Sequence, residues 1–225
     1  MQEEKGKYTA EAVGDEFVRL GVIELLESST GLTMEDRLFE PLAAYLNLVC
    51  EWNEFASLTS GGDAARLIKN HLIDSVSLVP YIVQKAGTSG TLLDVGSGGG
   101  FPAIPIKLLC PNLELMLVER VARKVGFIRK VTATLGLKDI SIRHEEFLWN
   151  YLARNPNVIT ARAVERADYL VRKILPGMAV GCSFLCQSGN PQSLVGTMFH
   201  VEHIDDEWRA RGLRRGELYI VTRQP

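Results

Sequence analysis

The sequence predicts an α/β fold in which a mostly parallel sheet carries helices on both faces and follows a segment built of helices alone. From Thr91 onward, stretches with strand composition alternate with stretches of helical periodicity, a pattern typical of parallel strands joined by right-handed crossovers. Before that point the chain has only helical spacing. We therefore expect an N-terminal helical portion at residues 1–85 and a sheet-containing portion at residues 86–225.

Three helices are expected in the N-terminal portion. Apolar side chains recur at helical spacing over residues 9–27, and the sequence SSTG then ends the pattern. A second helix is expected to follow Thr33, a good N-cap residue, and to reach Trp52. A third runs from about Asp63 to Val83.

The second portion is expected to contain five strands and four helices in alternation, followed by an antiparallel pair. The strands are predicted at residues 91–95, 114–119, 139–143, 157–161 and 180–187, and the helices at 102–110, 121–136, 145–153 and 166–175. The final pair is predicted at 198–204 and 217–223. Ligands of such sheets bind beyond the carboxyl ends of the strands, where the strand order reverses.

A glycine-rich loop follows the first strand in the sequence LLDVGSGGGFP. The strand ends at Asp94, and Gly96, Gly98 and Gly100 let the backbone turn sharply and approach a ligand closely. Backbone amides next to a helix start favour an anionic or carboxylate-bearing group. Glu119, at the end of the following strand, could accept hydrogen bonds from two vicinal ribose hydroxyls. The pattern predicts a site for a nucleotide-type cofactor.

Three interpretations of this loop are open. A dinucleotide fingerprint, for NAD or FAD, requires G-x-G-x-x-G, but Phe101 takes the place of the third glycine in the frame that starts at Gly96. The loop could also be a tight structural turn. The pattern D-x-G-x-G-x-G, with an acid at the end of the next strand, resembles instead the S-adenosylmethionine (SAM) loop of Rossmann-like methyltransferases, and we favour SAM.

Composition narrows the class of protein. The net charge of −2 is not that of a typical nucleic-acid-binding domain. No apolar run reaches the roughly 20 residues of a membrane span, and the charged N-terminus is unlike a signal peptide. The four cysteines form no C-x-x-C pair, so neither a disulfide nor a metal site is expected. We expect a cytoplasmic monomer with no membrane contact and no metal.

Positive charge is nevertheless concentrated in two segments. One contains Arg120, Arg123, Lys124, Arg129 and Lys130, and the other contains Arg209, Arg211, Arg214 and Arg215. Either segment could be an ordinary solvated face or a rim that binds an anionic substrate.

Several phrases together resemble one family. They are WNEFASLTS, HLIDSVSLVPY, LLDVGSGGGFPAIPI, LVERVARKVGFIRKV, RHEEF and ITARAV, within residues 35–225. In this order they are similar to the glucose-inhibited division protein B family of guanine-N7 methyltransferases for small-subunit (16S) ribosomal RNA. The resemblance implies a SAM-dependent, Rossmann-like methyltransferase fold with a seven-stranded sheet and an N-terminal helical extension. The implied partner is small-subunit rRNA or the ribosomal subunit.

The resemblance also implies cofactor contacts at Gly96, Phe101, His144, Glu145 and Arg162. To these the loop itself adds Asp94, Ser97, Gly98 and Gly100, and the end of the next strand adds Glu119. Arg123, Lys124 and Arg162 are the expected substrate-binding residues, since their cations could meet phosphates.

Several of these residues have a structural alternative. Glu119 could be a surface acid paired with Arg120 or Arg123, and Phe101 could pack the helix start rather than cover the cofactor. We favour a structural role for the ring of His144. The same holds for His71 and Asp74, which lie one helical turn apart. No residue is predicted to be catalytic, because guanine N7 already carries an in-plane lone pair and needs no strong base.

The chain departs from the family pattern at two places. Ser57 replaces the asparagine of N-L-T, and Gln187-Ser188 replaces K-G after the fifth strand. The loss of a lysine removes one potential phosphate contact. These departures leave open a methyltransferase of the same fold with another substrate, and a non-catalytic SAM-sensing protein that binds the ribosome.

Overall fold

The computed structural model describes residues 8–59, 66–147, 149–162, 167–187 and 189–225. Its centre is a seven-stranded sheet with the strand order β3-β2-β1-β4-β5-β7-β6. The strands are β1 (Thr91–Val95), β2 (Glu114–Glu119), β3 (Ile140–His144), β4 (Val158–Ala161), β5 (Ser183–Cys186), β6 (Phe199–Ile204) and β7 (Leu218–Arg223). The predicted fold class is confirmed, with each predicted strand present and its bounds shifted by a few residues at most.

The first five strands are parallel, and β7 runs antiparallel to both β5 and β6. The order reverses at β1, whose neighbours are β2 on one side and β4 on the other. In this register Asp94 lies opposite Leu117 of β2 and Thr160 of β4. The carboxyl end of β1 is thus the switch point at which sheets of this kind bind ligands.

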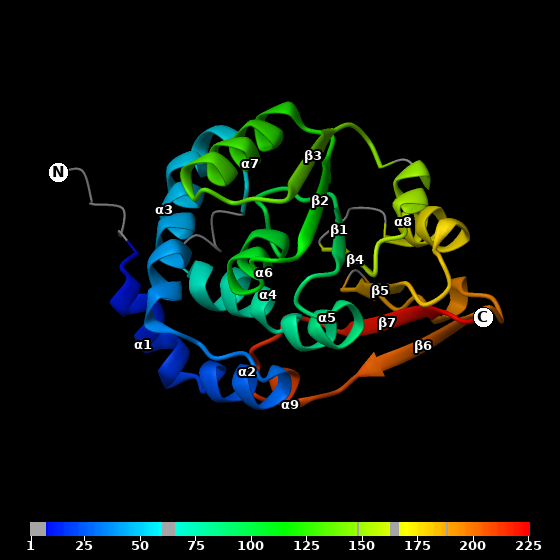
Figure 1. The fold of residues 1–225 in the computed structure, drawn as a ribbon, viewed down its shortest axis with the longest axis horizontal. Coiled ribbons are helices and arrows are strands. Elements are labelled where there is room, and N and C mark those ends of the chain that lie inside the picture. Colours follow the sequence, from blue (N-terminus) through cyan, green and yellow to red (C-terminus); the bar gives the residue numbers. More distant parts are fainter. Residues whose placement is uncertain (1–7, 60–65, 148, 163–166, 188) are drawn as a thin grey trace.

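Helices cover both faces of the sheet (Figure 1). Those before it are α1 (Ala10–Arg19), α2 (Val22–Thr30), η1 (Asp36–Leu38), α3 (Phe39–Ala56), η3 (Ile68–Ile73), α4 (Asp74–Val76) and α5 (Val79–Ala86). Those within and after it are α6 (Ala103–Leu109), α7 (Ala122–Thr134), η4 (Trp149–Arg154), α8 (Ala167–Ile174), η5 (Leu175–Gly177), η6 (Gln192–Leu194) and α9 (Glu207–Ala210). In the part that the structure describes, no helix is long and apolar enough to cross a membrane.

The N-terminal helices differ from their predicted form. The first is two helices, because Gly21 adopts a left-handed conformation with φ of 67° between them. Thr33 is not an N-cap: the helix starts with η1, and the Met34 amide donates to Glu27. The third is interrupted, since η3 is a π-helical turn and α5 starts anew after Leu78. The beginning of that third prediction, residues 63–65, lies outside the described residues.

The prediction for one helix of the second portion is also wrong, in the type of helix. Residues 145–153 were expected to form an α-helix, and the described part of this stretch contains a 3₁₀ helix, η4, that begins only at Trp149. Before it, the Glu145 amide donates to the backbone oxygen of Glu119, so this residue continues the β2–β3 pairing rather than starting a helix.

Alternating residues of β1 face two different hydrophobic cores. Leu93 and Val95 pack with residues of α8, including Val171, whereas Leu92 packs with residues of α3, α6 and α7. Because successive side chains of a strand point to opposite faces, Asp94 lies on the same face as Leu92. The N-terminal helices share the core of that face. They are therefore placed to contribute side chains to the site.

In the second cluster of positive charge, Arg209, Arg211 and Arg214 form ion pairs. The Arg214 side chain is fully buried, donates to both carboxylate oxygens of Asp206 at 2.9 and 2.7 Å, and lies over the Tyr81 ring. Arg209 pairs with Glu217 and Arg211 pairs with Glu207. These contacts support a structural role for Arg214, because it links the C-terminal segment to Tyr81 of α5. The ion pairs of Arg209 and Arg211 are partly exposed and lie within the C-terminal segment, so a substrate-binding rim at these two residues stays a prediction.

Candidate active site

The glycine loop takes a conformation that its three alternate glycines permit. Gly96, Gly98 and Gly100 have φ of 76°, 54° and 85°, values that residues with a β-carbon rarely adopt. At Gly100 a β-carbon would lie 2.7 Å from the Ile104 side chain. At Gly98 it would meet nothing closer than the Gly96 oxygen at 3.6 Å. The loop is thus closed against the protein at Gly100 and open at Gly98.

Glu119 holds this loop in place. Its side chain is 5% exposed, and its two carboxylate oxygens accept the amides of Gly98 and Val121, each at 2.8 Å. Arg120 and Arg123 are exposed, so Glu119 is not a surface acid paired with them. A carboxylate offers about four lone-pair positions. After two amide bonds, Glu119 retains acceptor capacity for hydroxyl groups of a ligand.

Asp94 is a buried carboxyl group at the end of β1. One oxygen accepts a hydrogen bond from the Thr160 hydroxyl at 2.7 Å. The other, Oδ2, is buried and has no hydrogen-bond partner within the described part of the chain. Burial raises the pKa of Asp94 to about 6, although the Thr160 hydrogen bond opposes the shift. Ser97 donates to the Asp94 backbone oxygen at 3.1 Å and so fixes the turn that leaves the strand.

Arg162 follows β4 and is held by the N-terminal helices. Its guanidinium contacts Asp74 Oδ2 at 2.6 Å and His71 Nδ1 at 2.8 Å, and its Cζ lies 5.4 Å from the centre of the Phe101 ring. His71 and Asp74 were expected to have a structural role, and each binds Arg162 directly. Burial raises the pKa of Asp74 while Arg162 acts in the opposite sense. Asp74 also accepts the Arg215 amide at 2.6 Å.

Phe101 packs at the start of α6. Its ring is 7% exposed and lies 5.0 Å, between centroids, from the rings of both Tyr45 and His71. The Tyr45 hydroxyl donates to the Gly99 carbonyl at 2.6 Å, so a buried side chain of α3 holds the backbone of the glycine loop. The packing alternative for Phe101 therefore has direct support. Tyr45 could not be identified from the sequence, because it occupies what looks like one more apolar position of a helix.

His144 and Glu145 reach the same end of the sheet. His144 lies opposite Glu119 in the β2–β3 register, and His144 and Glu145 are both exposed. The Tyr151 hydroxyl donates to the Glu145 carboxylate. The structure thus brings the predicted cofactor residues of β1, β2 and β3 together at the carboxyl ends of these strands.

The predicted substrate residues lie around the carboxyl ends of these strands. Arg123 and Lys124 occupy the first turn of α7, where Arg123 is exposed and Lys124 is half-buried. Gln187 is directed at Asp74, at 3.5 Å. Ser188 lies outside the described residues. Among the described residues, no group of three or more His, Cys, Asp or Glu side chains could hold a metal ion.

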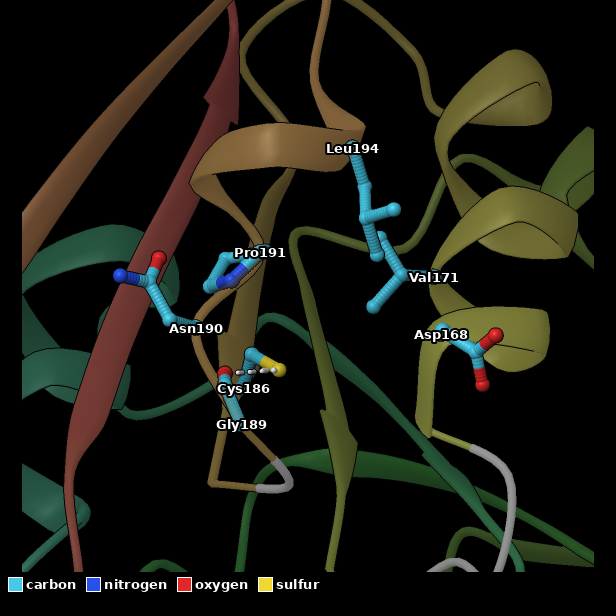
Figure 2. A pocket seen from close by; sticks show the side chains of 7 residues that line it. All are labelled: Asp168, Val171, Cys186, Gly189, Asn190, Pro191 and Leu194. Atoms are coloured by element: carbon cyan, nitrogen blue, oxygen red, sulfur yellow. Dashed lines mark hydrogen bonds between the residues drawn. The ribbon is translucent and has the colours of Figure 1, made fainter.

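A cavity of about 270 Å³ lies on the α8 side of the sheet, at the carboxyl end of β5 (Figure 2). It is lined by Asp168, Val171, Cys186, Gly189, Asn190, Pro191 and Leu194. In Figure 2 the carboxylate of Asp168 and the carboxamide of Asn190 point away from each other, and the apolar side chains of Val171, Pro191 and Leu194 lie between them. This cavity could not be predicted from the sequence, since its lining comes from separate elements.

The chain matches one family of known proteins over most of its length. A family model described as "GidB: rRNA small subunit methyltransferase G" matches residues 39–193. A protein of Leptothrix cholodnii named ribosomal RNA small subunit methyltransferase G is 36% identical over 183 residues, which cover 77% of this chain and 83% of that protein. A protein of Alkaliphilus metalliredigens with the same name is 34% identical, over 71% of this chain and 67% of its own length.

Solved structures with low sequence identity share the fold. An O-methyltransferase from Bacillus cereus, in complex with SAH, has a TM-score of 0.57 at 11% identity and covers 91% of this chain and 97% of its own. A putative O-methyltransferase from Klebsiella pneumoniae has a TM-score of 0.56 at 15% identity, with the same coverage. The sheet order and the N-terminal helices thus belong to a methyltransferase fold.

The open side of the loop at Gly98 gives a direct test of the cofactor site. We expect Gly98→Val to abolish SAM binding while the protein stays folded, because the side chain would fill space that the protein itself leaves free. The matched control is Gly136→Val, at a glycine with a similar φ of 61° and no atoms nearby. Calorimetry with SAM, together with a denaturant titration, measures both effects. Unchanged SAM affinity in Gly98→Val would refute the assignment of the loop.

Proposed function

We propose that this chain, which belongs to the rRNA small subunit methyltransferase G family, transfers a methyl group from SAM to N7 of a guanine in 16S rRNA. The observation that carries the proposal is the glycine loop bonded to the buried Glu119 carboxylate at the switch point of the sheet. Residues 1–85 would serve as a helical portion and residues 86–225 as the cofactor-binding portion. We further propose that the protein acts as a monomer in the cytoplasm.

The residues present fit SAM on three observations. Asp94 Oδ2 is a buried acceptor that has no donor among the described residues, and the loop is open at Gly98. Glu119 retains lone pairs for ribose hydroxyls. We propose that the cofactor is held by Asp94, Gly96, Ser97, Gly98, Gly100, Phe101, Glu119, His144, Glu145 and Arg162.

Methyl transfer to guanine N7 requires no catalytic acid or base from the protein. SAM, when bound, supplies a methyl group activated by its sulfonium sulfur. Guanine N7 has its own lone pair, so the chain has to orient the base and exclude water rather than remove a proton. We accordingly assign no catalytic acid or base. The target base must also leave its stack to reach the edge of the sheet.

The activity itself can be tested with purified protein, isotopically labelled SAM and small ribosomal subunits from cells that lack the gene. We expect 7-methylguanosine to appear in the 16S rRNA, and mass spectrometry of the digested rRNA detects it. Label in another nucleoside would indicate a methyltransferase with a different target. SAM binding with no transfer to rRNA, free or in subunits, would favour a non-catalytic protein that senses SAM.

The proposed substrate contacts at Arg123 and Lys124 have a salt-dependent signature. Reversing both charges with Arg123→Glu and Lys124→Glu should weaken RNA binding and reduce the slope of log affinity against log salt by about two. The matched control reverses Arg37 and Lys85, which are likewise one exposed arginine and one half-buried lysine. RNA affinity at several salt concentrations is the measurement. An unchanged slope would mean that these two residues form a solvated face.

A further inference from the structure

We infer that the end of α3 and the adjoining face of α7 bind an unpaired stretch of RNA, with one base stacked on Phe55. The inference rests on the proposed function and adds a contact that it does not include. We call the surface the aromatic-basic patch and define it as Trp52, Phe55, Arg123, Arg129 and Lys130.

The aromatic part consists of one exposed ring on a rigid support. The Phe55 side chain is 66% exposed, and its ring packs edge-to-face on Trp52 with the centroids 6.0 Å apart. Trp52 is itself held, because its ring lies 5.9 Å from that of Phe127. Phe55 therefore presents an accessible ring that packs against a tryptophan which is itself in contact with α7. A single exposed apolar residue is common, and the charges around this one distinguish it.

Cations of α7 surround the aromatic pair. Trp52 reaches α7 at Gly126, where an added β-carbon would lie 4.0 Å from the Trp52 ring. On a helix the neighbours of position 126 are three or four residues away, and these include Arg123, Arg129 and Lys130. All three side chains are exposed, and no ion pair involves them among the described residues.

The surface remains positive when acids are counted. Glu51 and Glu54 lie on the same stretch of α3 as the aromatic pair and are exposed. The three cations of the patch, Arg123, Arg129 and Lys130, outnumber them. A cationic surface next to an exposed ring is complementary to phosphates that flank an unstacked base.

The patch adjoins the proposed active site. Leu58, three residues after Phe55, lies against the glycine loop, since a β-carbon at Gly99 would be 3.2 Å from that of Leu58. Arg123 lies in the first turn of α7, which begins just beyond Glu119. In Figure 1 the end of α3 lies beside α7. RNA whose target guanine is at the edge of the sheet could therefore place a neighbouring nucleotide on Phe55.

The test compares variants of Phe55 in the full-length protein. Binding of a labelled single-stranded RNA of about 12 nucleotides is measured for Phe55→Ala, Phe55→Leu and Phe55→Tyr. We expect a loss on the order of five- to 150-fold for alanine, as for one stacked base. The leucine variant should lose affinity as the alanine variant does, because leucine is apolar but has no ring. The tyrosine variant should bind RNA as the wild-type protein does, because it keeps an aromatic ring. The control is Val18→Ala in α1, where the side chain is 67% exposed.

Each outcome separates the inference from the proposed function. SAM affinity should be the same in all variants, because Phe55 lies outside the cofactor site. Wild-type RNA affinity in Phe55→Ala would overturn the inference even if the protein methylates 16S rRNA. If only binding to intact subunits were lost, the patch would contact a ribosomal protein, and the inference would again be wrong. Absence of methylation by the wild-type protein would refute the proposed function alone.

Discussion

The bonds from the Gly98 and Val121 amides to the Glu119 carboxylate are the interactions on which the rest of the site depends. They join the end of β2 to the glycine loop after β1 and to the start of α7. A buried carboxylate is costly unless it is hydrogen-bonded, and these two amides stabilise it. The same bonds fix the position of Gly98, where the loop leaves space for a ligand. They also fix the start of α7, whose first turn carries Arg123 and Lys124.

The N-terminal helices complete the site rather than only covering the sheet. Tyr45 donates to the carbonyl of Gly99, and His71 and Asp74 hold the guanidinium of Arg162. These contacts come from residues 54, 91 and 88 positions away in the chain. Their polar groups are satisfied only when helices and sheet pack together, which ties formation of the site to folding of the whole chain.

Local patterns predicted the elements well and the contacts between them less well. The glycines and Glu119 could be identified because a strand, a turn and a second strand end leave a short-range signature. Tyr45 and Arg214 could not be assigned, since a buried hydroxyl or guanidinium has no local pattern and its partners lie far along the chain. The break at Gly21 was missed because the apolar spacing continues across it, although glycine adopts a positive φ easily. The π turn at Ile68–Ile73 was missed because helical spacing alone does not distinguish it from an α-helix.

The most direct test of the account is the SAM affinity of Glu119→Ala, with Glu114→Ala, at the exposed start of the same strand, as the control. Loss of the carboxylate should weaken SAM binding by about 1–3 kcal/mol, since ribose hydroxyls would lose their acceptor and the loop its anchor. The control should bind SAM as the wild-type protein does. SAM affinity within about twofold of wild type in Glu119→Ala, where a factor of ten is about 1.4 kcal/mol, would contradict the account.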